Sequence, residues 1–192
     1  VGELARSFHD MEQQISRQIT ELNASRDAMA HLAHHDALTG LPNRRMFEQR
    51  LAQALELSRR SGRDCALLFV DLDDFKAIND GRGHAVGDLV LQAVARVILG
   101  AVRQADTVAR LAGDEFTVLC ENVDSEEAAL QIVAKLEQAF APPLDIEGQP
   151  FPVRASIGVS LFPRDAQDAH TLLANADAAM YRVKMSRRNG IA

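Results

Sequence analysis

The stretch that most constrains the fold of this chain is a continuous apolar run, Cys65–Val70, which closes on an acidic residue, Asp71. A run of this kind is expected of a strand that is covered on both faces, because a strand with one face in water alternates apolar and polar side chains. The sequence therefore predicts a sheet with this run as a central strand and with Asp71 at its end.

A second stretch, RLAGDEFTVLC at Arg110–Cys120, has the pattern of a β-hairpin. An apolar segment leads into a small-residue turn at Ala112–Gly113, two carboxylates follow at Asp114 and Glu115, and a β-prone run leads out. A sheet that pairs this hairpin with the apolar strand would gather these carboxylates and Asp71 at one end. Clustered acids repel one another unless a cation neutralises them, and Mg²⁺ prefers hard oxygen ligands, including those of phosphates. The pattern predicts a metal–nucleotide site.

Composition limits the classes of partner. The 192 residues suffice for one domain with its own core and an extension. With a net charge of −6 and no basic run, the chain is not expected to bind nucleic acid, which requires clustered Lys and Arg. Cys65 and Cys120 lie in apolar runs, which favours reduced, buried thiols over a disulfide. No stretch reaches the roughly 18 apolar residues of a membrane span, so no direct membrane contact is expected.

The first 33 residues carry apolar side chains on a seven-residue repeat and contain no proline. The repeat positions are Val1, Leu4, Phe8, Met11, Ile15, Leu22, Met29 and Leu32. Such a stripe must pack on another helix, and the simplest partner is the same helix of a second subunit. We expect a coiled-coil homodimer, with an amphipathic helix lying on its own domain as the alternative. The polar seam residues Gln18 and Ser25 would allow two arrangements of similar energy, which suits a signalling stalk.

Apolar periodicity and helix breakers predict the other elements. Helices are expected from Pro42 to about Arg60, over Val86–Ala101, Ser125–Phe140 and Ala169–Met185, and a further strand over Phe151–Phe162. Asn43 is expected to cap the first of these helices.

Four motifs in order resemble one family, the diguanylate cyclases with a GGDEF domain. LAGDEF is similar to the signature turn, with Ala112 in place of the first glycine. DALTGLPNRRMF, from Asp36 to Phe47, resembles the motif D-x-L-T-x-L-x-N-R. The segment FVDLDDFKAINDGRGHAVGDLVL, Phe69–Leu91, matches D-x-D-x-F-K-x-x-N-D-x-x-G-H-x-x-G-D throughout. The last segment, NADAAMYRVKMSRRN, resembles the family's closing segment, with Arg187 in place of a usual glycine.

The resemblance implies an α/β (α+β) fold like the palm of nucleotide cyclases and polymerases: a mainly antiparallel central sheet of about five strands flanked by helices. Residues 1–35 would form the signalling helix and residues 36–192 the catalytic domain. The implied reaction joins two GTP molecules into cyclic di-GMP and releases two pyrophosphates, with Mg²⁺ or Mn²⁺ and one GTP per subunit of a dimer. The alternative is a non-catalytic module that binds GTP or cyclic di-GMP and signals by contact.

The resemblance also assigns roles to the acidic residues. Asp71, the backbone carbonyl of Leu72, Asp114 and Glu115 would hold the metal. Asp114 would also receive the proton of the attacking hydroxyl, and Glu115 and Lys184 would complete the catalytic set. If the position of Ala112 requires a positive φ, its methyl group adds strain of about 1 kcal/mol.

Further residues would bind the substrate. Phe75 and Lys76 would lie at the phosphates, Asn79 and Asp88 would bind guanine, and Lys184 and Arg188 would hold the triphosphate. His84 and Gly113 belong to the same implied site, where Gly113 leaves room for the nucleotide. Each has a structural alternative: a turn for Asn79 and Asp80, a helix N-terminal acid for Asp88, and basic residues at a helix C-terminus for Lys184 and Arg188.

Two more features imply regulation. Arg103 and Asp106 form an R-x-x-D pattern ahead of the signature turn, which the resemblance makes an inhibitory site for cyclic di-GMP; an exposed Arg–Asp pair is the alternative. VGELARSFHDM resembles the end of the second helix of a HAMP linker. That likeness implies the cytoplasmic output domain of a receptor in the bacterial inner membrane.

Overall fold

The computed structural model describes residue 11, residues 14–22 and residues 33–188, apart from the side chain of Arg188. The chain divides into two compact units, Val1–His35 and Asp36–Ala192. In the first unit, Met11 and residues 14–22 are helical, and Ile15, Ile19 and Leu22 are exposed. The rest of the predicted coiled-coil repeat, residues 1–10, 12–13 and 23–32, lies outside the described residues.

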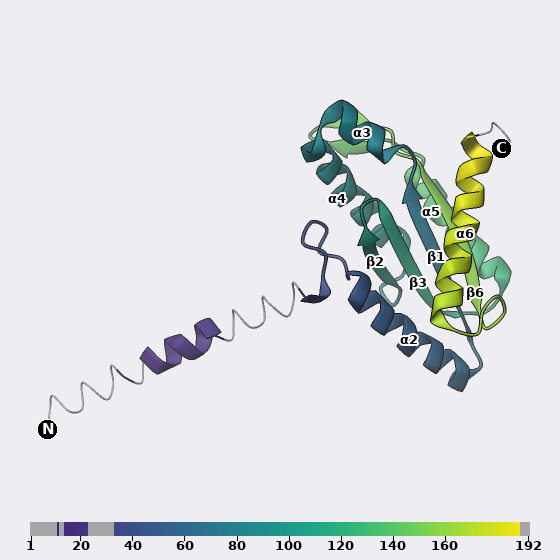
Figure 1. Ribbon diagram of the computed structural model, residues 1–192, viewed down its shortest axis with the longest axis horizontal. Helices are drawn as coiled ribbons and strands as arrows, with labels where there is room; N and C mark the ends of the chain where they lie inside the picture. Colours follow the sequence, from purple (N-terminus) through teal and green to yellow (C-terminus); the bar gives the residue numbers. More distant parts are fainter. Residues whose placement is uncertain (1–10, 12–13, 23–32, 189–192) are drawn as a thin grey trace, which may run out of the picture. The chain divides into compact units, whose positions relative to one another are not determined.

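The second unit is built on an antiparallel sheet (Figure 1). In the described part of the chain the sheet has four strands in the order β2-β3-β1-β6: β2 Thr107–Ala112, β3 Glu115–Val123, β1 Asp64–Leu72 and β6 Ala155–Phe162. The apolar run lies in β1, which pairs with β3 on one side and β6 on the other. The central strand and the hairpin are therefore confirmed.

The sheet has one strand fewer than the expected five. Strands β4, Leu144–Ile146, and β5, Gln149–Phe151, pair with each other in a separate two-stranded sheet. The strand expected over Phe151–Phe162 is interrupted, and only its second part joins the main sheet as β6. Pro152 stands at the interruption, and proline has no N–H to donate to a ladder.

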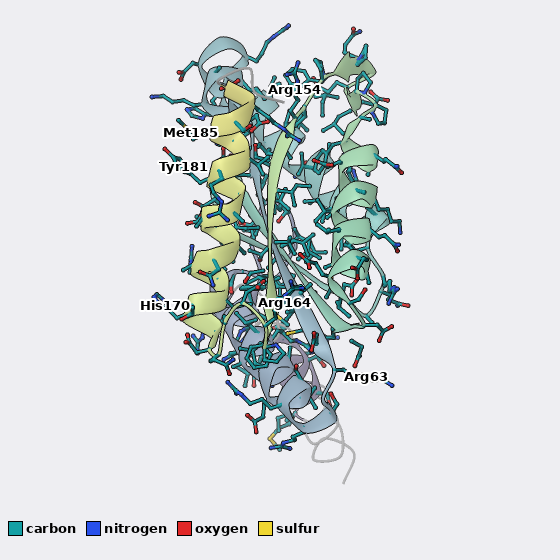
Figure 2. All side chains as sticks on the ribbon, turned by 90° about the vertical axis from the view of Figure 1, so that its right-hand side faces the viewer. Arg63, Arg154, Arg164, His170, Tyr181 and Met185 are labelled. Atoms are coloured by element: carbon teal, nitrogen blue, oxygen red, sulfur yellow. The ribbon has the colours of Figure 1, made fainter. Side chains whose placement is uncertain are left out.

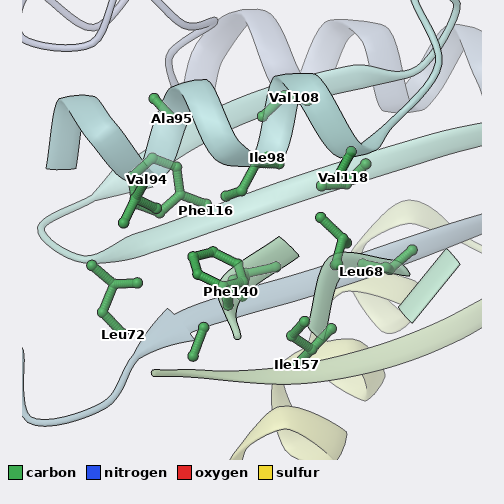
Figure 3. Close-up of a cluster of buried hydrophobic side chains, with 14 of the residues drawn as sticks. Leu68, Leu72, Val94, Ala95, Ile98, Val108, Phe116, Val118, Phe140 and Ile157 are labelled. Carbon is green, nitrogen blue, oxygen red and sulfur yellow. The ribbon is translucent and has the colours of Figure 1, made fainter. Parts of the chain in front are cut away.

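Helices cover both faces of the sheet. They are α2 Arg44–Ser61, α3 Phe75–Arg82, α4 His84–Ala101, α5 Glu126–Phe140 and α6 Ala169–Arg188. Alternate residues of β1 divide between two cores: Leu68 and Val70 pack in a cluster with residues of α4 and α5 (Figure 3), while Leu67 and Phe69 pack with residues of α2 and α6. This alternation follows from the period of two in a strand. The predicted antiparallel sheet flanked by helices is confirmed.

Local sequence signals set the helix boundaries. The Asn43 side chain accepts a hydrogen bond from the Met46 N–H at 3.1 Å, so it caps α2 as predicted. Ser125 caps α5 in the same way, through the Ala128 N–H. The turn given as the structural alternative for Asn79 and Asp80 is not present, because both residues lie within helix α3.

Helix α4 is, among the described residues, the one helix whose length and mean hydropathy of 1.4 would suit a membrane span. No membrane span was expected from the sequence, because no stretch reaches the roughly 18 apolar residues of a span. Its residues Val90, Val94 and Ile98 are fully buried in the protein core. A core helix meets the same criterion, so the packing accounts for the apolar composition.

Helix α6 lies unusually close to the sheet. A Cβ atom at Gly158 of β6 would come within 2.1 Å of the Met180 backbone nitrogen and 2.2 Å of the Ala176 carbonyl oxygen. Only glycine allows this close packing of α6 against β6, the strand next to β1. The C-terminal half of α6 is thereby held beside the end of the sheet that carries Asp71.

Candidate active site

The predicted acids meet at one end of the sheet. Asp71, near the end of β1, pairs directly with Glu115, the first residue of β3. Directly paired residues of antiparallel strands project to the same face with their Cβ atoms about 5 Å apart. Asp114 precedes Glu115 in the turn, and all three side chains are partly buried. The structure thus brings together three of the four residues expected to hold a metal, and Leu72 adjoins them in the chain.

The acids disfavour one another's charge. Burial raises the pKa of Asp71, and the negative charges of Asp114 and Asp73 raise it further, although Lys184 opposes the shift. Burial likewise raises the pKa of Glu115; Arg44 opposes that shift, while Asp177, Asp71 and Asp114 add to it. Carboxylates in such a cluster are stabilised by an added cation.

A cation from a remote part of the chain already contacts this cluster. The Lys184 ammonium on α6 donates to Asp71 Oδ1, although 113 residues separate them in sequence. On the other side, Arg44 Nη2 lies 3.8 Å from Glu115 Oε2. These contacts place Lys184, a predicted catalytic residue, directly at a predicted metal ligand.

The protein alone supplies an incomplete metal shell. Within the described ranges, no three His, Cys, Asp or Glu side chains are grouped closely enough to hold an ion. Mg²⁺ is commonly bound through one or two carboxylates, with substrate phosphates and waters completing the shell. Paired Asp71 and Glu115, with raised pKa values and Asp114 beside them, fit this mode of binding.

The signature turn tolerates its alanine. Ala112 pairs with Glu115 in the ladder and is absent from the residues with positive φ, so the expected strain at this position is not present. Gly113 is the residue that requires freedom, with φ +48°. A Cβ atom at Gly113 would meet nothing within 4 Å, which leaves the backbone open on the outer side of the turn.

An ion pair that was not predicted from the sequence, Arg110–Asp36, contacts this turn through the Gly113 carbonyl oxygen. Arg110 Nη1 donates to Asp36 Oδ1 and Oδ2 at 2.9 and 3.1 Å, and its Nε donates to the Gly113 carbonyl oxygen at 2.9 Å. Although burial opposes it, hydrogen bonds from Thr39 and Arg110 lower the pKa of Asp36. Both residues lie in recognised motifs, but no spacing signal connects positions 74 residues apart.

The residues expected to bind guanine lie on two packed helices. Asn79 is on α3, and Asp88 and His84 are one turn apart and exposed on α4. A Cβ atom at Gly87 would lie 2.0 Å from Asn79 Oδ1, so this glycine gives the amide its place beside α4. The structure therefore brings Asn79 next to the turn of α4 that carries Asp88.

The residues expected at the phosphates differ in how exposed they are. Phe75 is buried at the start of α3, and the next residue, Lys76, is exposed. An open cavity of about 840 Å³ lies between α3, the β5–β6 connection and the end of α6; its charged lining residues include Asp73, Arg154, Lys184 and Arg187. Figure 2 shows Arg154 and Met185 near the top of the view, with His170 and Arg164 lower down. The Arg188 side chain, expected at the triphosphate, lies outside the described residues.

The R-x-x-D residues lie at the other end of β2. Asp106 Oδ2 accepts a hydrogen bond from the Arg103 backbone N–H at 2.8 Å, which closes a turn. Both residues line a cavity of about 200 Å³, together with Gln131 and Lys135 of α5. Lys135 therefore brings a second cation to this pattern from another element.

Comparison with known proteins identifies the family. Residues 33–190 match the model for "Diguanylate cyclase, GGDEF domain". The chain belongs to the GGDEF diguanylate cyclase family. Among curated GGDEF proteins, a bifunctional diguanylate cyclase/cyclic di-GMP phosphodiesterase, MucR of Pseudomonas aeruginosa, is 44% identical over 94% of this chain and 26% of its own length. The diguanylate cyclase TpbB of the same species is 39% identical over 98% of this chain and 43% of its own length. The chain thus spans less than half of each of these relatives.

Solved GGDEF structures agree with this fold. The isolated GGDEF domain of TpbB superposes with a TM-score of 0.77 at 43% identity, covering 80% of this chain and 90% of that one. The coiled coil and GGDEF domain of DgcB from Caulobacter crescentus, solved with cyclic di-GMP, gives a TM-score of 0.74 at 25% identity. It covers 94% of this chain and 95% of that one. Cyclases of this family generally use a divalent metal.

Proposed function

We propose that this GGDEF domain condenses two molecules of GTP into cyclic di-GMP with release of two pyrophosphates. The observation that carries the proposal is the direct pairing of Asp71 with Glu115, beside Asp114 and in contact with Lys184. The proposal is supported because acids suited to a metal and a cation suited to phosphate lie together at one end of the sheet, in a chain of the GGDEF diguanylate cyclase family.

The chemistry requires a nucleophile, charge neutralisation and a stabilised leaving group. The 3′-hydroxyl of one GTP attacks the α-phosphorus of the other in line, a P–O bond forms, and pyrophosphate leaves. A divalent cation held by Asp71, the Leu72 carbonyl, Asp114 and Glu115 would supply charge neutralisation and a lowered hydroxyl pKa. Asp114 receives the hydroxyl proton, and Lys184 and Arg188 neutralise the pyrophosphate.

Guanine selection is assigned to α3 and α4. The Asp88 carboxylate can accept hydrogen bonds from guanine N1–H and N2–H₂, and the Asn79 amide can address O6 or N3. A site that pairs these groups rejects adenine, because its own polar atoms would remain unsatisfied. Phe75 and Lys76 lie at the phosphate side, His84 lies one turn before Asp88 on α4, and Gly113 leaves the turn open for the second nucleotide.

Each domain holds one GTP, so turnover requires two domains face to face. The N-terminal helix, proposed as residues 1–35 ahead of a catalytic domain of residues 36–192, would dimerise and raise the effective concentration of one half-site for the other. In a membrane receptor with this cytoplasmic output domain, a change of helix register would then switch the rate. The HAMP-like sequence at the start of the chain supports this arrangement.

Product feedback is assigned to the cavity beside Arg103 and Asp106. Its size of about 200 Å³ and the presence of Lys135 support a site for part of an anionic ligand. Cyclic di-GMP supplies phosphates for the cations and guanine edges for Asp106 and Gln131.

The rival function, a non-catalytic binding module, drew its support from Ala112. That support weakens, because Ala112 lies in a regular strand position without positive φ. A domain that only bound nucleotide would also have no need of three acids whose charges oppose one another.

The deciding experiment incubates the chain with GTP and Mg²⁺ or Mn²⁺ at several protein concentrations and separates the nucleotides by chromatography. Cyclic di-GMP should form at a rate per subunit that rises with protein concentration, because two half-sites must meet. The D114A variant should bind GTP without forming product. Absence of product from wild-type protein that is dimeric and binds GTP would reject the enzyme and favour the binding module.

A further inference from the structure

Arg187, in the last turn of α6, contacts three separate parts of the domain. Its Nη1 donates to the Ala155 carbonyl oxygen at 2.6 Å, at the start of β6, and its Nη2 pairs with Glu137 Oε1 of α5 at 2.9 Å. Its Nη1 also lies 3.6 Å from Asp73 Oδ2, in the turn between β1 and α3. The planar fork of arginine can bridge several acceptors in this way, whereas the usual glycine of the family has no side chain to do so.

We propose that Arg187 is a positioning residue that clamps the end of α6 to the β1–α3 turn, so that Lys184 can transfer from Asp71 to the GTP triphosphate without α6 moving. This inference rests on the proposed function and deepens its account of phosphate binding. The clamp depends on Arg187, which stands where the closing motif described above has a glycine.

The turn that Arg187 holds directly follows Asp71 and Leu72, two of the four proposed metal ligands, which end β1. Asp73 Oδ1 accepts a hydrogen bond from Ser156 Oγ at 2.7 Å, and the Asp73 N–H donates to the Arg154 carbonyl oxygen at 2.9 Å. With Arg187 on its second oxygen, Asp73 is directed toward β6 and α6. The chain from Asp71 through Leu72 is therefore anchored immediately after its metal-binding atoms.

Helical spacing makes Lys184 and Arg187 a pair. Residues three apart lie on one side of a helix, and these two cations contact Asp71 and Asp73, which are themselves two residues apart. A divalent cation on Asp71 competes with the Lys184 ammonium for the same carboxylate, so lysine is the contact that must yield. Lysine is a mobile point charge on a flexible stem, whereas Arg187 is fixed by three acceptors and stays.

Arg187 also has an electrostatic effect on the substrate. Asp73 and Arg187 both line the cavity beside Lys184, where the triphosphate would bring several negative charges. Without Arg187, the neutral Ser156 hydroxyl would be the remaining side-chain partner of Asp73 in the described part of the chain. Loss of the arginine should therefore weaken the binding of GTP more than the chemical step.

The first test measures hydrogen exchange in the full chain without nucleotide or metal, comparing wild type, R187G and R182G. Arg182 is an exposed residue of the same helix, so R182G controls for the cost of glycine in a helix. In R187G, amides of residues 72–75 should exchange about fivefold faster or more, because an anchor of the turn is lost. R182G should leave that turn unchanged. Equal exchange of residues 72–75 in R187G and wild type would overturn the clamp.

The second test measures binding of α,β-methylene-GTP, which cannot release pyrophosphate, in the presence of Mg²⁺. R187G should weaken binding about tenfold, R187K should recover part of the loss, and kcat at saturating GTP should change less than threefold. In a D73N background the effect of R187G should shrink, because the residue acts through Asp73. A fall in kcat with unchanged analogue affinity would contradict a positioning role. If wild-type protein that is dimeric and binds GTP makes no cyclic di-GMP, the proposed function fails, while hydrogen exchange still decides whether the clamp exists.

Discussion

Two carboxylates of this domain, Asp36 and Asp71, are both partly buried and both paired with a cation, yet their pKa values shift in opposite directions. Asp36 is surrounded by donors, from Thr39 and Arg110, and its pKa is lowered. Asp71 contacts Lys184 but also faces Asp114 and Asp73, and its pKa is raised. One ion pair satisfies its acid, whereas the other leaves an acid that an added cation would still stabilise. The difference distinguishes a structural ion pair, Asp36–Arg110, from an acid of the proposed metal site, Asp71.

The largest expected effect is the loss of cyclic di-GMP synthesis when Asp71 is replaced. D71N removes one charged ligand and the partner of Lys184, and cyclic di-GMP synthesis should fall about 10³-fold, the scale seen when a preorganised charge-stabilising group is lost. Stability should change little, because the substitution also relieves repulsion in the cluster. Turnover by chromatography and thermal unfolding of the same preparation measure the two effects. Activity within tenfold of wild type would remove Asp71 from the metal site.

Replacing Asp36, the acid that has its full set of donors, should reduce stability more than turnover. D36A leaves Arg110, whose side chain is 11% exposed, without its carboxylate, and unfolding free energy should fall by about 2 kcal/mol, in the range for charged hydrogen bonds. Denaturant unfolding measures the loss, and the T39A variant serves as a milder control at the same carboxylate. Turnover should fall less than in D71N, because Asp36 acts on the signature turn only through Arg110.

The pH dependence sharpens the contrast. The pKa of Asp36 lies below its ordinary value of 3.8, so its ionised form contributes stability above that pH, and this contribution is lost as pH falls through the lower folded value. The stability difference between wild type and D36N should therefore be constant above about pH 5 and shrink under more acidic conditions. Chemical unfolding across this range gives the curve. A difference that grows on acidification would mean that Asp36 is not held as a carboxylate.

The smallest expected effect is a small gain in the unfolding temperature when Glu115 is replaced. Burial and the neighbouring acids raise the pKa of Glu115, so ionised Glu115 costs some folding stability relative to the unfolded chain. E115Q should unfold at a slightly higher temperature than wild type in EDTA, and the gain should disappear when metal and GTP are added to both proteins. A lower unfolding temperature in EDTA would show that the contact with Arg44 outweighs the repulsion.

Local sequence patterns predicted most strands and helices of the fold, but they did not predict helix α3 or the ion pairs between distant residues. The apolar run of β1, the hairpin at Asp114 and the cap at Asn43 are local signals, and the structure confirms them. Helix α3 was missed because Asn79, Asp80 and Gly81 favour turns locally, while packing against α4 decides the outcome. The pairs Asp36–Arg110 and Asp71–Lys184 depend on contacts across 74 and 113 residues, for which a single sequence has no spacing rule.

The same limit applies to the departures from the family pattern. Ala112 looked like a source of strain, because the turn was read as needing a positive φ, but that requirement belongs to Gly113. Arg187 looked like a minor change, because its acceptors come from α5, β6 and the β1–α3 turn. A substitution can be weighed only when its neighbours are known.

The most direct test of the account mixes wild-type chain with an excess of D71N in the presence of GTP and Mg²⁺. If each subunit holds one GTP and forms one of the two phosphodiester bonds, mixed dimers should make a single bond and accumulate the linear dinucleotide pppGpG. Cyclic di-GMP should fall faster than the wild-type fraction. Cyclic di-GMP as the sole product, falling only in proportion to the wild-type fraction, would contradict the account, because a single subunit would then complete both bonds.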